Sequence, residues 1–126
     1  MADEYIAGVC NIGKAETRQR LIVSFVGLGA ALGLASWLVA TDASTAARWF
    51  VLLPFMVWAI GLVQARNRFC LAYGLAGTFN FGRLGSTTRV VDPEFRKADQ
   101  RTVLRLAAIS LTYALAATLG FVLLPI

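Results

Sequence analysis

The sequence predicts an all-α membrane protein with three transmembrane helices, a short interfacial segment and a cytoplasmic connector that leads into an extended third helix. Of its 126 residues, 58% are hydrophobic and 15% are charged, whereas charged residues make up about 25% of an ordinary soluble domain. The charges cluster between long apolar runs, and about 20 apolar residues suffice to cross a bilayer. Because three such spans use roughly half of the chain, we expect a single membrane domain over residues 1–126.

The first two spans are predicted from apolar runs. Residues 21–40 (LIVSFVGLGAALGLASWLVA) contain no charge, and Trp37 lies near their far end, as is typical of tryptophan at a membrane interface. The second span is predicted at residues 46–65, with Trp49 near its start and Pro54 in its body. A short polar turn separates the two spans.

The third span is predicted at residues 106–126. Before it, residues 69–82 are apolar and rich in glycine, but they are too few to cross the membrane and return, which favours an interfacial or partly re-entrant segment. Asp92, Pro93 and Glu94 offer an N-cap, a proline for the first helical position and an early acid. We therefore predict one continuous helix from Pro93 through the third span, with its first turns in the cytoplasm.

The basic residues predict the orientation. Three precede the first span and eight lie in the connector at residues 66–105, whereas Arg48 alone is assigned to the first connecting loop, at the very start of the second span. The positive-inside rule then places the N-terminus and the connector in the cytoplasm and the C-terminus on the opposite side. We expect the protein in the bacterial cytoplasmic membrane.

Several function classes lack their usual residues. The chain has no histidine, which removes the commonest general base and metal ligand. No acid, lysine or arginine lies centrally in a predicted span, although transporters and proton pumps usually need such groups. No nucleotide-binding loop, nucleophile–base pair or metal cluster is evident. We therefore expect no enzyme, and we attribute the net charge of +5 to topology rather than to nucleic-acid binding.

The residues before the first span predict a capped helix start. Asn11 or Gly13 can cap the helix, and Glu16 suits its first turn and can pair with Arg20 at i,i+4. With Gly27, these residues resemble the start of YgaP-like inner-membrane domains, two-helix transmembrane segments that are sometimes fused to rhodanese domains. The resemblance covers about the first thirty residues. Because this chain has a third span, a long connector and no rhodanese domain, we carry over no sulfur chemistry.

Two cysteines, Cys10 and Cys70, do not form a CxxC motif, and the predicted topology places both at the cytoplasmic face. They could act as thiols in redox exchange or soft-metal binding, with Cys10 activated by a helix N-terminus. Alternatively, each is an ordinary buried cysteine in a reducing compartment, which we favour. Two cysteines without histidine cannot complete a tetrahedral zinc site on one chain.

Small residues recur at four-residue spacing on two predicted spans and indicate close helix packing, within the chain or with a partner. The first set is Gly29 and Gly33, and the second is Thr112, Ala116 and Gly120.

A basic face is predicted where the third helix enters the membrane, because Lys97, Arg101 and Arg105 follow one another at four-residue spacing. Contact with anionic lipid headgroups is the interpretation we favour, and a salt-bridged contact with a neighbouring subunit is the alternative.

The sequence favours a non-catalytic accessory subunit of a larger membrane protein complex, such as a respiratory or photosynthetic energy-converting complex. The expected partners are other membrane subunits and membrane lipids, with no nucleic acid. The alternative is a thiol-dependent protein in redox, sulfur or soft-metal handling. No cofactor is required, but a pigment could use Asn80, and a carotenoid or lipid tail could lie against Phe25, Phe50 and Phe55.

Overall fold

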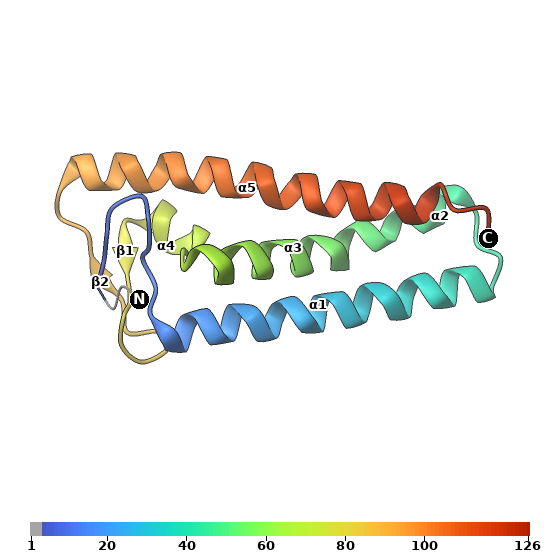
Figure 1. The fold of residues 1–126 in the computed structure, drawn as a ribbon, viewed down its shortest axis with the longest axis horizontal. Helices are drawn as coiled ribbons and strands as arrows, with labels where there is room; N and C mark the ends of the chain where they lie inside the picture. Colours follow the sequence, from blue (N-terminus) through green and yellow to red (C-terminus); the bar gives the residue numbers. More distant parts are fainter. Residues whose placement is uncertain (1–3) are drawn as a thin grey trace.

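The computed structural model describes residues 4–126 and contains three long helices, of which α3 lies between α1 and α5 (Figure 1). The elements are α1 (Lys14–Ala40), α2 (Thr45–Arg48), the 3₁₀ turn η1 (Trp49–Val51), α3 (Leu52–Asn67), α4 (Leu71–Ala76), β1 (Thr78–Phe79), β2 (Thr88–Arg89) and α5 (Pro93–Val122). Three stretches are long and apolar enough to cross a membrane: Lys14–Ala40, Thr45–Asn67 and Pro93–Val122. The predicted all-α class with three spanning helices is confirmed.

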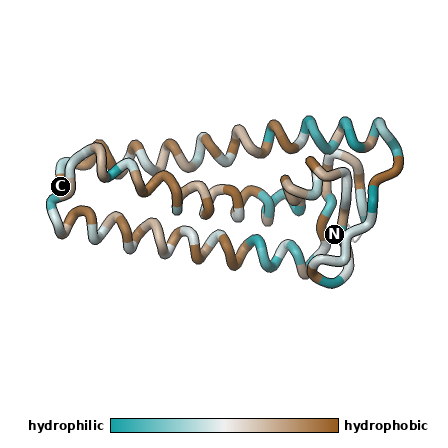
Figure 2. The backbone as a smooth tube through the Cα atoms, turned by 180° about the vertical axis from the view of Figure 1, so that it is seen from behind, coloured by the Kyte–Doolittle hydropathy of each residue, from teal (hydrophilic) through white to brown (hydrophobic). Residues whose placement is uncertain are grey.

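The two ends of the bundle differ in structure (Figure 1). One end, here called the connector end, holds residues 4–13 and 68–92 with α4 and both strands. The other, here called the turn end, holds residues 41–51 and the C-terminus. Hydropathy follows this division, because the hydrophilic stretches of α1 and α5 lie toward the connector end (Figure 2).

Helix α1 begins at Lys14, seven residues before the apolar run, because the polar residues that precede this run continue the same helix. Gly13 is its N-cap, and Asn11 has another role, described below. The helix ends at Ala40, where the hydroxyl of Thr41 donates a hydrogen bond of 2.9 Å to the carbonyl of Trp37.

The second spanning segment is not one regular α-helix. The 3₁₀ turn Trp49–Val51 joins α2 to α3. Pro54 explains this turn, because its nitrogen has no hydrogen to donate to the carbonyl of Phe50 and its ring crowds that carbonyl. The proline thus lies in the first turn of α3, where it is tolerated, and not in the middle of a helix.

Helix α5 is continuous from Pro93 to Val122, as the sequence predicts. The side chain of Asp92 caps it by accepting a hydrogen bond of 2.9 Å from the amide of Glu94. Gly120 does not interrupt the helix, which ends at Val122, four residues before the predicted end.

Small side chains let α1 and α3 approach closely. A Cβ atom added at Gly27 would lie 2.5 Å from the backbone nitrogen of Trp58, and one added at Gly61 would lie 2.8 Å from the backbone of Arg20 and of Ser24. The hydroxyl of Ser24 also donates a hydrogen bond of 2.9 Å to the carbonyl of Trp58. In a lipid environment, close packing of this kind supplies most of the attraction between helices.

Helix α5 packs on the other side of α3 through its own small residues, and α1 and α5 hardly touch each other. Ser110, Ala114 and Thr118, spaced four residues apart, are fully buried there. Ala114 joins the larger core cluster with Phe55 and Ala59 of α3. The three helices therefore form an open arrangement in which each keeps an uncovered apolar face.

The predicted interfacial segment folds at the connector end as α4 and β1. Phe69 is fully buried and packs with Val103 and Leu106 of α5. Gly77 ends α4 with a positive φ of 71°, a conformation that glycine adopts without strain. Strand β1 then pairs with β2 in a short antiparallel ladder that the sequence did not predict.

Candidate functional site

The most elaborate polar structure lies at the connector end and begins with Asn11, which is completely buried. Its side-chain amide donates to the carbonyl of Cys70 (3.1 Å), and its side-chain oxygen accepts from the amide of the same residue (2.6 Å). The main chain of Asn11 also bonds to Arg68 and Asn80. One asparagine therefore joins the N-terminal segment to the chain that follows α3 and to the chain that follows α4.

A second contact fixes the N-terminal segment on α5. Asp99, which is completely buried, accepts hydrogen bonds from the hydroxyl of Tyr5 (2.6 Å) and from the amide of Gly8 (2.7 Å). The hydroxyl of Thr102 donates to the carbonyl of Gly8 (2.7 Å). These four residues form what we call the N-terminal latch, which ties residues 5–8 to the first turns of α5.

The surroundings of Tyr5 keep its phenol neutral. Its ring stacks on Phe79, with ring centres 4.8 Å apart. Burial, followed by the hydrogen bond to Asp99 and the charge of that carboxylate, raises the pKa of Tyr5 above its ordinary value. The neutral phenol of Tyr5 can donate its proton in the hydrogen bond to Asp99, and the raised pKa keeps it in this form.

A third cluster surrounds the thiol of Cys70. The guanidinium of Arg20 donates to the sulfur of Cys70 at 3.1 Å and lies 3.7 Å from the carboxylate of Glu16. It also lies over the ring of Tyr73, 5.9 Å from its centre. Burial, followed by the neighbouring Glu16 carboxylate, raises the pKa of Tyr73. The predicted Glu16–Arg20 pair therefore forms, but Glu16 is buried, Arg20 is partly buried, and the guanidinium also reaches a cysteine, a contact that was not predicted from the sequence.

Both cysteines are buried free thiols, with exposed fractions of 3% for Cys10 and 2% for Cys70. They lie at the same end of the bundle and are connected through Asn11, which follows Cys10 and bonds to the main chain of Cys70. Buried thiols in such settings react slowly with reagents in solution. Within residues 4–126 no three potential ligands among histidine, cysteine, aspartate and glutamate gather at one point.

The suggested pigment ligand, Asn80, is already engaged within the chain. Its side-chain amide donates to the carbonyl of Arg83, and its side-chain oxygen accepts from the amide of Gly82 at 2.9 Å. Phe55 is buried in the helix core, whereas Phe25 and Phe50 are exposed. Only the two exposed phenylalanines therefore remain as surfaces for a carotenoid or a lipid tail.

Both sets of small residues proposed for helix packing face away from their own chain. A Cβ added at Gly29, Gly33 or Gly120 would meet no atom within 4 Å among the described residues. Thr112 and Ala116 are exposed as well. Packing within the chain uses other small residues, Gly27 and Gly61 among them, and packing with a partner stays a prediction for the outward sets.

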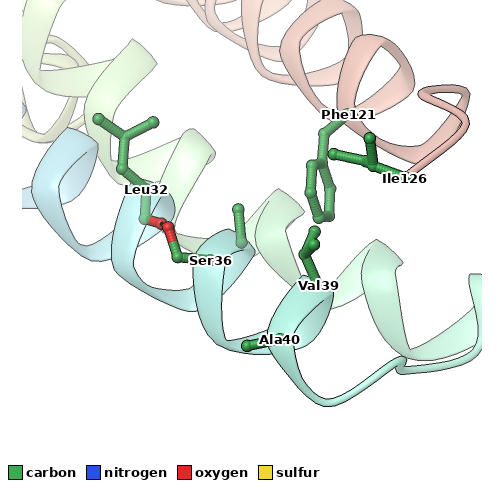
Figure 3. Close-up of a pocket in the computed structure, with 7 residues that line it drawn as sticks. Leu32, Ser36, Val39, Ala40, Phe121 and Ile126 are labelled. Carbon is green, nitrogen blue, oxygen red and sulfur yellow. Dashed lines mark hydrogen bonds between the residues drawn. The ribbon is translucent and has the colours of Figure 1, made fainter.

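An apolar groove of about 450 Å³ lies between α1 and α5 near the turn end (Figure 3). It is lined by Leu32, Ala35, Ser36, Val39 and Ala40 of α1 together with Phe121 and Ile126. Its one hydroxyl, that of Ser36, donates to the carbonyl of Leu32 at 2.8 Å. The groove therefore offers shape and apolar surface rather than hydrogen bonds.

The predicted basic face lies on the exposed side of α5, near its start. Lys97, Arg101 and Arg105 are all exposed. Lys97 approaches Glu94 at 3.8 Å, a surface pair that contributes little stability. Arg101 and Arg105 flank a shallow pocket beside Gly8, so the N-terminal latch and the basic face adjoin.

The sequence matches no family model, and comparisons with curated proteins and with solved structures give no match either.

Proposed function

We propose that this protein is a non-catalytic accessory subunit that packs against a transmembrane helix of a larger membrane complex. One observation carries the proposal: the outward side of α1 has an exposed row of small residues that continues into the apolar groove. Gly29, Gly33, Ser36 and Ala40 follow at spacings of four, three and four residues and are all exposed. Ser36 and Ala40 also line the groove.

The physical basis is close approach. Between helices in lipid there is little hydrophobic driving force, so association depends on dispersion and on backbones that come near each other. A partner helix lying on Gly29 and Gly33 would meet no side chain larger than hydrogen at these positions. Its own side chains could then enter the groove beside Ser36, toward Phe121.

A leucine at Gly33 tests this surface. The Gly33→Leu variant should insert normally, because leucine is at least as apolar, but it should hold the partner away. We expect at least about tenfold less co-migration with larger species after mild detergent extraction from the native host, at unchanged membrane level, which corresponds to about 1.4 kcal/mol. Ala30→Leu is the matched control, since Ala30 is exposed on the same helix, next to Gly29 but outside the row.

Two results would count against the proposal. A wild-type protein that runs alone in several mild detergents would have no partner to lose. Equal co-migration of the wild type and the Gly33→Leu variant would mean that the partner does not contact Gly33. The contact would then involve the connector end or the small residues of α5, Thr112, Ala116 and Gly120.

Within this proposal, the connector end faces the cytoplasm of a bacterial cell and the turn end faces the opposite side. The charge distribution along the sequence supports this orientation. Energy-converting complexes are the assemblies we favour, because small supernumerary subunits are frequent in them.

A thiol-dependent role is the second candidate, and the contact between Arg20 and Cys70 favours it. The guanidinium of Arg20 donates to the sulfur of Cys70 at 3.1 Å, and reactive cysteines often have a cationic neighbour of this kind. One oxygen of the buried Glu16 carboxylate accepts no hydrogen bond from residues 4–126. Burial of the sulfur, at 2% exposure, argues against open access for a substrate.

Serine substitution of both cysteines separates the two candidates. Under the accessory role, the variant with Cys10→Ser and Cys70→Ser should accumulate and associate with partners as the wild type does. Normal accumulation together with loss of a cellular phenotype would instead place the thiol role first.

A further inference from the structure

A polar groove of about 300 Å³ opens between α3 and α5, where α3 ends at the connector end. Val63, Arg66 and Asn67 of α3 line it on one side, and Ile109 and Tyr113 of α5 line it on the other. It differs from the groove at the turn end because cationic, amide and phenol groups surround an apolar floor.

The polar groups of this groove have spare bonding capacity. Neither the guanidinium of Arg66 nor the hydroxyl of Tyr113 forms an ion pair or a side-chain hydrogen bond with residues 4–126. The amide nitrogen of Asn67 donates to the carbonyl of Val63 at 2.8 Å. A guanidinium, a phenol and an amide at one place can all contact an oxyanion.

The groove lies where the apolar part of the bundle ends. Arg66 is the first charged residue after the apolar run of α3, which is the position expected for a membrane boundary. Tyr113 belongs to the apolar part of α5, but helical side chains lean toward the helix N-terminus. For α5 that direction is the connector end, so the phenol of Tyr113 leans toward the level of Arg66.

The surrounding charge is positive. Arg105 precedes Ile109 by one helical turn on α5 and is exposed. The acids at the start of the same helix are occupied, because Asp99 is bonded within the latch and Glu94 lies beside Lys97. A negatively charged ligand in the groove therefore meets attraction on both sides.

We propose that the α3–α5 groove binds the headgroup of an anionic phospholipid of the adjacent leaflet. The guanidinium of Arg66 contacts the phosphate, Tyr113 donates its hydroxyl to it, and the lipid chains extend away from the groove along the outer surface of the bundle. This site is separate from the surface of the proposed partner contact, since the two grooves share no lining residue. It also places headgroup recognition beside Arg66 rather than on the outer basic face of α5 alone.

Lipid binding by the full-length protein in mild detergent tests this site, with native mass spectrometry as the readout. Phosphatidylglycerol should bind at least tenfold more tightly than phosphatidylcholine. Arg66→Gln should weaken phosphatidylglycerol binding about tenfold or more, and Tyr113→Phe about threefold or more, because each removes a hydrogen bond to a charged group. Arg18→Gln is the matched control, since Arg18 is an exposed arginine of α1 near the same end, and its effect should stay within twofold.

Four outcomes would overturn the proposal. Equal weakening by Arg18→Gln and Arg66→Gln would mean general attraction to a positive surface. Equal binding of the two lipids would mean that the groove does not recognise an anionic headgroup. Displacement of phosphatidylglycerol by millimolar inorganic phosphate would mean that the groove binds a free phosphate as well as a lipid. A dimer that dissociates in Arg66→Gln while lipid binding persists would make the occupant a second copy of the chain. Circular dichroism should show that the variants are folded, and we expect Arg66→Gln to fold because Arg66 is exposed.

Discussion

Replacing Asp99 with alanine should release the N-terminal segment from α5 while the three long helices stay in place. The carboxylate accepts two hydrogen bonds, from Tyr5 at 2.6 Å and from Gly8 at 2.7 Å, and it is completely buried. Alanine removes both acceptors and leaves the phenol and the amide without partners unless the segment opens to water.

The magnitude follows from the two bonds. A hydrogen bond to a charged group contributes about 1.5–3 kcal/mol. We take the lower value for each bond, because water can satisfy both donors once the latch opens, which gives about 3 kcal/mol in total. At about 1.4 kcal/mol per tenfold change, the open population should rise on the order of 100-fold.

Cys10 is a built-in reporter of this opening. Its thiol is 3% exposed in the closed segment, so a maleimide reaches it only when the segment opens. When opening and closing are faster than labelling, the labelling rate follows the open population. Mass spectrometry of the peptide that contains Cys10 distinguishes it from Cys70, and we expect labelling about 100-fold faster in Asp99→Ala than in the wild type.

Two further variants test whether the hydrogen bonds to Asp99 hold the segment closed. Asp99→Asn keeps one acceptor of similar shape, so its labelling should be about tenfold faster than that of the wild type. Lys97→Ala, two residues away and exposed, should have no effect. Labelling of Asp99→Ala within threefold of the wild-type rate would show that the two hydrogen bonds do not hold the segment.

Three other predictions concern the packing of α1, the N-terminal latch and the orientation in the membrane. The Gly27→Leu variant should accumulate less in the membrane, because a Cβ alone would lie 2.5 Å from the backbone of Trp58. The Gly29→Leu variant should accumulate normally, and immunoblots of membrane fractions compare the two. Because the pKa of Tyr5 is raised above its ordinary value of 10.0, its contribution to stability is complete below pH 10 and declines as the pH rises further toward the folded-state pKa. The melting temperatures of the wild type and Tyr5→Phe should therefore differ at pH 8, and the difference should shrink progressively above pH 10. Reporter fusions after Thr45 and at the C-terminus should both report the non-cytoplasmic side, and a cytoplasmic signal from either would contradict the orientation.

Much of the secondary structure could be predicted because its signals are local. The apolar run at residues 21–40 identifies a helix by length and composition. Asp92 and Pro93 mark the start of α5 because a cap and a proline act within one turn. Glu16 and Arg20 pair because i,i+4 geometry brings them together on any helix.

The inward face of each helix could not be predicted in the same way. In a soluble helix, polar residues mark the outside, but α1 is apolar all round within its spanning part. A glycine is compatible with a lipid-facing position, such as that of Gly29, and with a helix-facing position, such as that of Gly27. Composition alone therefore does not indicate which glycine faces the neighbouring helix. The four-residue spacing of Gly29 and Gly33 drew attention to the outward side, whereas the closest approach to α3 occurs at Gly27.

The sequence by itself determined the three spans, the continuous third helix and the accumulation of positive charge at one end of the bundle, because each depends on neighbours along the chain. Only the tertiary structure decided that Asn11 forms hydrogen bonds with Cys70, that Asp99 accepts one from Tyr5 and that Arg20 donates one to the sulfur of Cys70. These partners are separated by 59, 94 and 50 residues. A buried polar group must find a hydrogen-bonding partner, but which distant residue supplies it depends on how the helices pack, and that packing leaves no local pattern in the sequence.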